Sequence, residues 1–105
     1  MENKTILLIC TAGITTGLLV KKIQKLIEDE GKDYHIYSAP AIVVESILKE
    51  QKIDALLMGP QSRYEISRLE ELLNYKKVPY RLIDNEDYEI LNAQAIYNKL
   101  KTMIQ

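Results

Sequence analysis

Cys10 is the single cysteine of the chain, and its surroundings give it the position of a reactive group. It follows Thr5-Ile6-Leu7-Leu8-Ile9, a short apolar and β-branched run that is typical of a buried strand. The next seven residues are rich in glycine and threonine: Thr11, Ala12, Gly13, Ile14, Thr15, Thr16 and Gly17. Leu18-Leu19-Val20 then opens a helical pattern. The cysteine is therefore expected where a strand gives way to a loop and a helix N-terminus.

This position favours a negative charge on or beside the sulfur. Backbone N–H groups at a helix start lack intrahelical partners, and a glycine-containing loop can turn further N–H groups inward. Lowering a thiol pKa from about 8.5 to about 6 takes roughly 3.4 kcal/mol. The helix dipole supplies only about 0.3–1 kcal/mol of that, so N–H···S hydrogen bonds from the loop must supply most of the rest. The sequence thus predicts a loop that binds a thiolate or a phosphoryl group.

Several chemistries compete for such a cysteine. Cysteine-dependent phosphatases use C-x5-R-[S/T], but Thr16 stands here where that arginine is needed and Gly17 where Ser or Thr is needed. A missing arginine removes transition-state stabilisation for hydrolysis, whereas it suits a carrier whose phosphocysteine must persist. A dithiol reductase would need a second cysteine, and neither a dinucleotide nor a Walker motif is present. The loop favours relay over hydrolysis. A small cysteine phosphatase and a non-catalytic interaction module remain as alternatives.

Two segments resemble one family, the enzyme IIB components of the lactose/cellobiose class of the phosphoenolpyruvate-dependent sugar phosphotransferase system. Residues 10–20 resemble its C-x-A-G-M-S-T-S-L-L-V signature, and residues 59–64, Gly-Pro-Gln-Ser-Arg-Tyr, resemble its G-P-Q-x-R-Y. This chain has Gly17 in place of the usual Ser, which removes a hydroxyl that could donate to the sulfur, and Ile14 in place of the usual Met.

The resemblance implies a function for Cys10. In that family the cysteine accepts a phosphoryl group from a histidine of the IIA protein and passes it to a sugar held by the membrane IIC transporter. By resemblance, the sugar is a β-disaccharide such as cellobiose or lactose, and the chain is a phosphotransferase component. The backbone of residues 11–17 would bind the phosphoryl oxygens, and Thr11, Thr15 and Thr16 would add hydroxyl donors.

The second segment predicts another loop at the site. If the sheet is parallel, the loop that begins at Gly59 lies at the same sheet edge as the Cys10 loop. We expect Gln61, Arg63 and Tyr64 at the rim of the site, without an assigned chemical role. Ser62 followed by Glu65 is a capping-box pattern, so a helix is expected to start here.

The elements that must position these loops alternate between strand and helix. Strands are expected at 5–9, 34–39, 54–59 and 78–83, and helices at 15–30, from Pro40 to about 52, after Ser62, at 88–91 and from Asn92 onward. This alternation predicts an α/β fold, a four-stranded parallel sheet with helices on both faces. The resemblance implies strand order 2-1-3-4, as in the fold of low-molecular-weight tyrosine phosphatases and cellobiose IIB proteins.

Composition narrows the function further. The chain has 105 residues, enough for one domain spanning 1–105, and a net charge of −1, which gives no electrostatic footprint for nucleic acid. No apolar run reaches the length of a membrane helix, and the first strand follows Met1 too closely for a signal peptide. One cysteine and one histidine, His35, disfavour a metal site, and His35 is expected to be a structural or surface residue. We expect a cytosolic monomer without cofactor.

Overall fold

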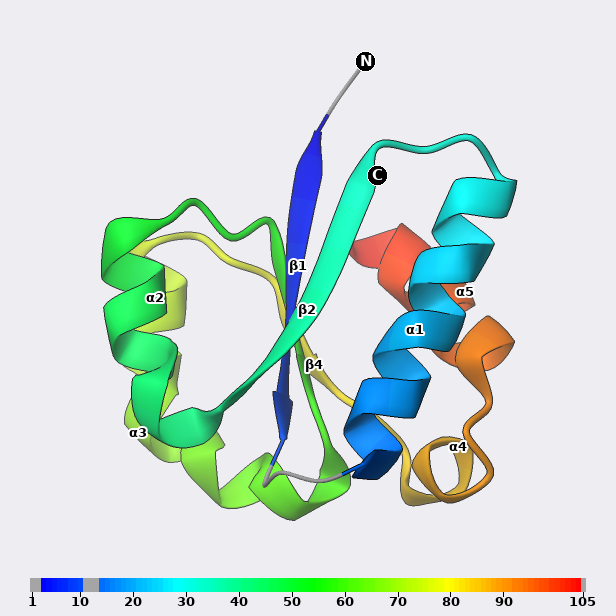
Figure 1. The fold of residues 1–105 in the computed structure, drawn as a ribbon. Helices are drawn as coiled ribbons and strands as arrows, with labels where there is room; N and C mark the ends of the chain where they lie inside the picture. The colour runs from blue at the N-terminus through cyan, green and yellow to red at the C-terminus, as the bar shows by residue number, and fades with distance from the viewer. Residues whose placement is uncertain (1–2, 11–13, 105) are drawn as a thin grey trace.

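The computed structural model describes residues 3–10 and 14–104, with the backbone alone at Cys10, Ile14, Thr15 and Gln61. Strands and helices alternate along the chain (Figure 1). The strands are β1 (Lys4–Cys10), β2 (Tyr34–Pro40), β3 (Ala55–Met58) and β4 (Tyr80–Leu82). The helices are α1 (Ile14–Asp29), α2 (Val44–Glu50), α3 (Ile66–Tyr75), α4 (Asn85–Glu89) and α5 (Ala93–Ile104), with two 3-10 helices, η1 (Ala41–Val43) and η2 (Pro60–Glu65).

The four strands form one parallel sheet in the order β2-β1-β3-β4. This confirms the predicted fold class and strand order. In the register, Cys10 lies opposite Pro40 of β2, and Ile9 lies opposite Met58 of β3. Cys10 is therefore the last residue of an inner strand. β4 lies at the edge of the sheet, and Pro79 comes just before it. A proline is tolerated there because its missing N–H interrupts no hydrogen bond between central strands.

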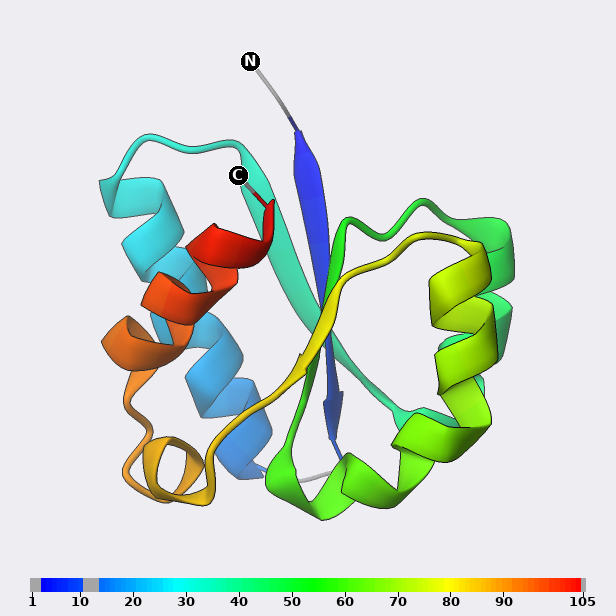
Figure 2. The ribbon, with the colours of Figure 1, turned by 180° about the vertical axis from the view of Figure 1, so that it is seen from behind.

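Helices cover both faces of the sheet, α1, α4 and α5 on one side and α2 and α3 on the other (Figures 1 and 2). Side chains of β1 alternate between these layers because successive strand residues point to opposite faces. Ile6 and Leu8 pack with α1 and α5, whereas Leu7 and Ile9 pack with α2 and α3. All four are fully buried, which is why this strand reads as one continuous apolar run.

Two helix boundaries follow the sequence signals. Gly31 has φ +70° and ends α1, and the N–H of Lys32 donates to the carbonyl of Ile27 at 3.2 Å. Asn92 caps α5, since its Oδ1 accepts a hydrogen bond from the N–H of Ala95 at 3.1 Å. The two boundaries agree with the helices expected at 15–30 and from Asn92 onward.

Other boundaries differ from the prediction. The capping box was wrong: Gly59, not Ser62, precedes the first helical turn, because Pro60 fixes φ at its first position. Ser62 lies inside η2, and Glu65 accepts hydrogen bonds from Arg68. Helical structure after β2 begins at Ala41 rather than Pro40, which is the last residue of the strand.

The C-terminal part also differs in detail. The acidic segment after β4 is helical, as α4 starts at Asn85 instead of Tyr88. Tyr97 is fully buried on α5, together with Ile96 and Leu100. None of the helices within residues 3–10 and 14–104 combines the length and apolar content that a membrane crossing requires.

Candidate functional site

Cys10 ends β1 at the carboxyl edge of the sheet, where β2 and β3 also end. Pro40 is its neighbour in β2. On the other side, the N–H of Gly59 donates to the carbonyl of Ile9 at 2.9 Å, which holds the start of η2 against the end of β1. The structure therefore confirms that the loops after β1 and β3 begin at the same sheet edge.

The predicted phosphate-binding loop is divided by the start of α1. Thr11, Ala12 and Gly13 lie outside the described residues, whereas Ile14, Thr15, Thr16 and Gly17 form the first turn of α1. The N–H groups of residues 14–16 precede the first possible i→i−4 hydrogen bond of this helix. With the positive end of the helix dipole, they form an environment that suits an anion, beginning four residues after Cys10.

A buried hydrogen bond fixes this first turn to another part of the chain. The Thr16 and Tyr88 hydroxyl oxygens lie 2.7 Å apart, and either can be the donor. Thr16 is 1% exposed and Tyr88, on α4, is 9% exposed. Sequence reasoning placed Thr16 in the loop but missed Tyr88, because no local pattern relates residues 72 positions apart.

Gly17 is exposed on the first turn, next to Thr16. A Cβ atom built on it has no heavy atom within 4 Å, apart from its chain neighbours and the backbone of its own helix turn. Its φ is not positive, so no backbone strain requires glycine here. The position has room for a side chain, and this chain leaves it without a hydroxyl.

The second loop brings three polar residues to the same edge, all within η2. Arg63 and Tyr64 are exposed and contact each other: Arg63 Nη2 donates to the Tyr64 hydroxyl at 3.2 Å, with the guanidinium 5.1 Å from the ring centroid. This hydrogen bond raises the pKa of Arg63 and lowers the pKa of Tyr64. Ser62 is different, since its side chain is 1% exposed and has no hydrogen-bond partner among the described residues.

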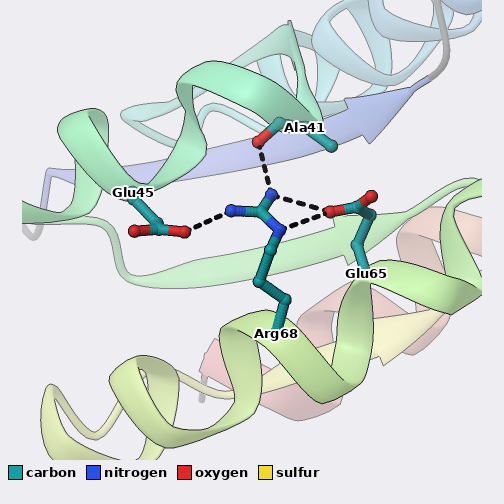
Figure 3. A network of polar contacts seen from close by, with 4 residues as sticks. All are labelled: Ala41, Glu45, Glu65 and Arg68. Carbon is teal, nitrogen blue, oxygen red and sulfur yellow. Dashed lines mark hydrogen bonds and ion pairs between the residues drawn. The ribbon is translucent and has the colours of Figure 1, made fainter.

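Arg68 of α3 ties together the segments that follow β2 and β3 (Figure 3). Its Nε donates to Glu65 Oε2 at 2.8 Å, and its Nη2 donates to the Ala41 carbonyl at 3.0 Å. It also pairs with Glu45 of α2. One guanidinium thus connects η1, which follows the strand neighbour of Cys10, to η2 and α3.

Other candidates lie elsewhere on the fold. His35 is exposed on β2 and stacks on Tyr37 at 5.9 Å, as expected for a surface residue. A groove of about 500 Å³ runs along the second half of α1, beside Lys22, Leu26 and Ile90, rather than at its first turn. Within the described ranges, no group of three or more His, Cys, Asp or Glu side chains could hold a metal ion.

Comparisons with known proteins agree with this architecture. Residues 5–99 match the family described as "PTS system, Lactose/Cellobiose specific IIB subunit". The chain is 33% identical over 99 residues to the cellobiose-specific EIIB component of Lactococcus lactis subsp. lactis (strain IL1403), covering 91% of this chain and 92% of that protein. It is 28% identical over 103 residues to the oligo-beta-mannoside-specific EIIB component of Bacillus subtilis (strain 168), covering 96% of each.

Solved structures show the same fold. The solution structure of a cellobiose-specific phosphotransferase IIB component from Borrelia burgdorferi aligns with a TM-score of 0.78 and 27% identity, covering 98% of this chain and 93% of that one. The lactose-specific IIB domain of Streptococcus pneumoniae, 13% identical, shares the fold with a TM-score of 0.85, covering 99% and 100% of the two chains. The chain therefore belongs to the lactose/cellobiose-specific IIB family of the sugar phosphotransferase system.

Proposed function

We propose that Cys10 accepts a phosphoryl group from a phosphohistidine of a IIA protein and passes it to a sugar bound by a IIC transporter. The observation that supports this most is the place of Cys10, at the end of an inner strand and four residues before the start of α1. Backbone amides of Thr11, Ala12 and Gly13, together with those of the first turn through Gly17, would hold the phosphoryl oxygens. The hydroxyls of Thr11 and Thr15 are further candidate donors, whereas the hydroxyl of Thr16, the third predicted donor, is already paired with that of Tyr88.

The proposed transfer is two in-line displacements. In the first, the Cys10 thiolate attacks phosphorus, the S–P bond forms, and the P–N bond to the histidine breaks, returning the electron pair to the imidazole, which takes up a proton. In the second, a sugar hydroxyl attacks phosphorus and loses its proton, the S–P bond breaks, and the thiolate is regenerated. The contribution of the protein is positioning and charge stabilisation.

The family membership supports the rest of the proposal. We infer that the chain forms one IIB domain over residues 1–105 and acts in the cytoplasm as a monomer. Its relatives include proteins named for cellobiose and oligo-beta-mannosides, which favours a β-linked disaccharide as the sugar class, and one named for the monosaccharide galactose. Gln61, Arg63 and Tyr64 are proposed as rim residues, because η2 starts at the edge where Cys10 ends.

The proposal is tested by intact mass after incubation with phosphoenolpyruvate, the general phosphotransferase proteins and a cellobiose-class IIA protein. One phosphoryl group is expected on the wild type, none on Cys10→Ser, and one on His35→Gln, which removes the only histidine as a competing acceptor. Turnover of an aryl phosphate would instead indicate a phosphatase. Neither labelling nor turnover, with a donor active on another IIB protein, would indicate an interaction module.

A further inference from the structure

The Ser62 hydroxyl is a buried polar group that forms no hydrogen bond within the described residues. The side chain is 1% exposed, and its Oγ has no hydrogen-bond partner among the described residues. Most buried polar groups in proteins are hydrogen-bonded, because an unpaired one loses water without compensation. An alanine at this position would avoid the free-energy cost of burying an unpaired hydroxyl. We therefore expect the hydroxyl to gain a partner in another state of the protein.

Ser62 lies close to the end of the strand that carries Cys10. The N–H of Ser62 donates to the carbonyl of Gly59 at 2.9 Å, and the N–H of Gly59 donates to the carbonyl of Ile9 at 2.9 Å. Two consecutive hydrogen bonds therefore connect Ser62 to the residue before Cys10. Figures 1 and 2 both show η2, in green, at the edge of the sheet where β1 ends.

The described side chains of the first turn of α1, those of Thr16 and Gly17, offer no unpaired hydroxyl. The Thr16 hydroxyl already has a buried partner in Tyr88, and Gly17 has no side chain. Ser62 does not cap a helix, since Gly59 precedes the first turn of η2 and no side-chain cap bond forms there. Its hydroxyl is thus the buried, unpaired donor that the described part of this edge offers.

We propose that Ser62 is a phosphoryl-binding residue whose hydroxyl donates a hydrogen bond to the phosphoryl group on Cys10. This rests on the proposed function. Ser62 keeps its proton throughout: it stabilises the charge on a non-bridging oxygen and neither forms nor breaks a covalent bond. This hydrogen bond is absent from the unphosphorylated protein and forms only when the phosphoryl group is present. It therefore stabilises the phosphoryl transfer and not the unphosphorylated fold.

The test compares Ser62→Ala with the wild type in two measurements, the labelling rate and the stability of the unphosphorylated protein, and only the labelling rate should fall. The rate of labelling by phosphorylated IIA is expected to fall about tenfold, the usual loss of a hydrogen bond to a charged group. The urea midpoint of the unphosphorylated protein is expected to stay the same or rise, because the unpaired hydroxyl is gone. Ser67→Ala, an exposed serine on α3, is the matched control and should change neither.

The outcomes separate this inference from the proposed function. Labelling of Ser62→Ala at the wild-type rate, while Cys10→Ser stays unlabelled, would overturn the role of Ser62 alone. A lower urea midpoint with slower labelling would also overturn it, since Ser62 would then have a partner in the resting fold. No labelling of the wild type by an active donor would overturn both.

Discussion

The Thr16 and Tyr88 hydroxyl oxygens lie 2.7 Å apart in the interior, joining the first turn of α1 to α4. Both side chains are buried, so neither hydroxyl can replace its partner by bulk water. The contact holds the turn that follows the Cys10 loop against the C-terminal part of the chain. A segment 72 residues away thereby positions the proposed phosphoryl-binding amides.

Replacing Tyr88 with Phe tests this contact. The ring remains, but Thr16 keeps a buried hydroxyl without a partner, so the free energy of unfolding should fall by about 1–3 kcal/mol. Urea denaturation measures the change. The double variant Thr16→Val/Tyr88→Phe should be less destabilised than the sum of the single variants, because it removes both polar groups. Strictly additive losses would show that the two hydroxyls do not interact.

Gly17, in the first turn of α1, and Gly31, just after its end, should respond differently to replacement by alanine. One replacement should raise the free energy of unfolding and the other should lower it. Gly17→Ala should raise the free energy of unfolding by about 0.5–1 kcal/mol, because the added methyl meets open space and glycine disfavours helix. Gly31→Ala is the matched control and should lower it by about 1 kcal/mol or more, because φ is +70° there. Destabilisation by Gly17→Ala in urea would contradict the open space observed around Gly17.

Arg68 should hold η1 in place beside the end of β1. Arg68→Met keeps a long side chain but removes the donors to Ala41 and Glu65. Amide hydrogen exchange in residues 41–43 should quicken several-fold, with the core of β1 unchanged, because only the local tie is lost. Arg68→Lys should give an intermediate result, since an ammonium lacks the planar set of donors. Unchanged exchange in η1 would show that the network does not restrain it.

Sequence reasoning succeeded where the residue types and the burial agree. The run Ile6–Ile9 is fully buried, and its continuous apolar and β-branched character is typical of an inner strand of a sheet covered on both faces. The alternation of strands and helices then led to the parallel topology. The position of Cys10 at the end of this strand followed directly, and that position underlies the proposed function.

Predictions failed where a tertiary contact overrides a local pattern. The Ser62–Glu65 spacing looks like a cap, but Pro60 starts the helical turns earlier and Arg68 takes the Glu65 carboxylate. The hydrogen bond from the Tyr97 hydroxyl to Glu30, which lies at a distant helix end, was not predicted either. Local spacing carries no information about such pairs.

Glu30 links the end of α1 to α5. Its Oε1 accepts a hydrogen bond from the Tyr97 hydroxyl at 2.8 Å, and its Oε2 accepts one from Lys101 Nζ at 3.1 Å. The hydrogen bond from Tyr97, followed by that from Lys101, lowers the pKa of Glu30 below its usual value. Burial, followed by the bond to Glu30, raises the pKa of Tyr97.

These shifts predict how stability depends on pH. Because the Glu30 pKa is lowered on folding, its stabilisation is present above the unfolded pKa of about 4.5 and is lost as the pH falls through the folded pKa. Glu30→Gln should therefore lose less stability than the wild type between about pH 5 and pH 3, measured by urea unfolding at each pH. Glu28→Gln, which removes an exposed carboxylate in the last turn of α1, is the control and should follow the wild type. Parallel acid profiles for Glu30→Gln and the wild type would mean that the carboxylate gains nothing from Tyr97 and Lys101 in solution.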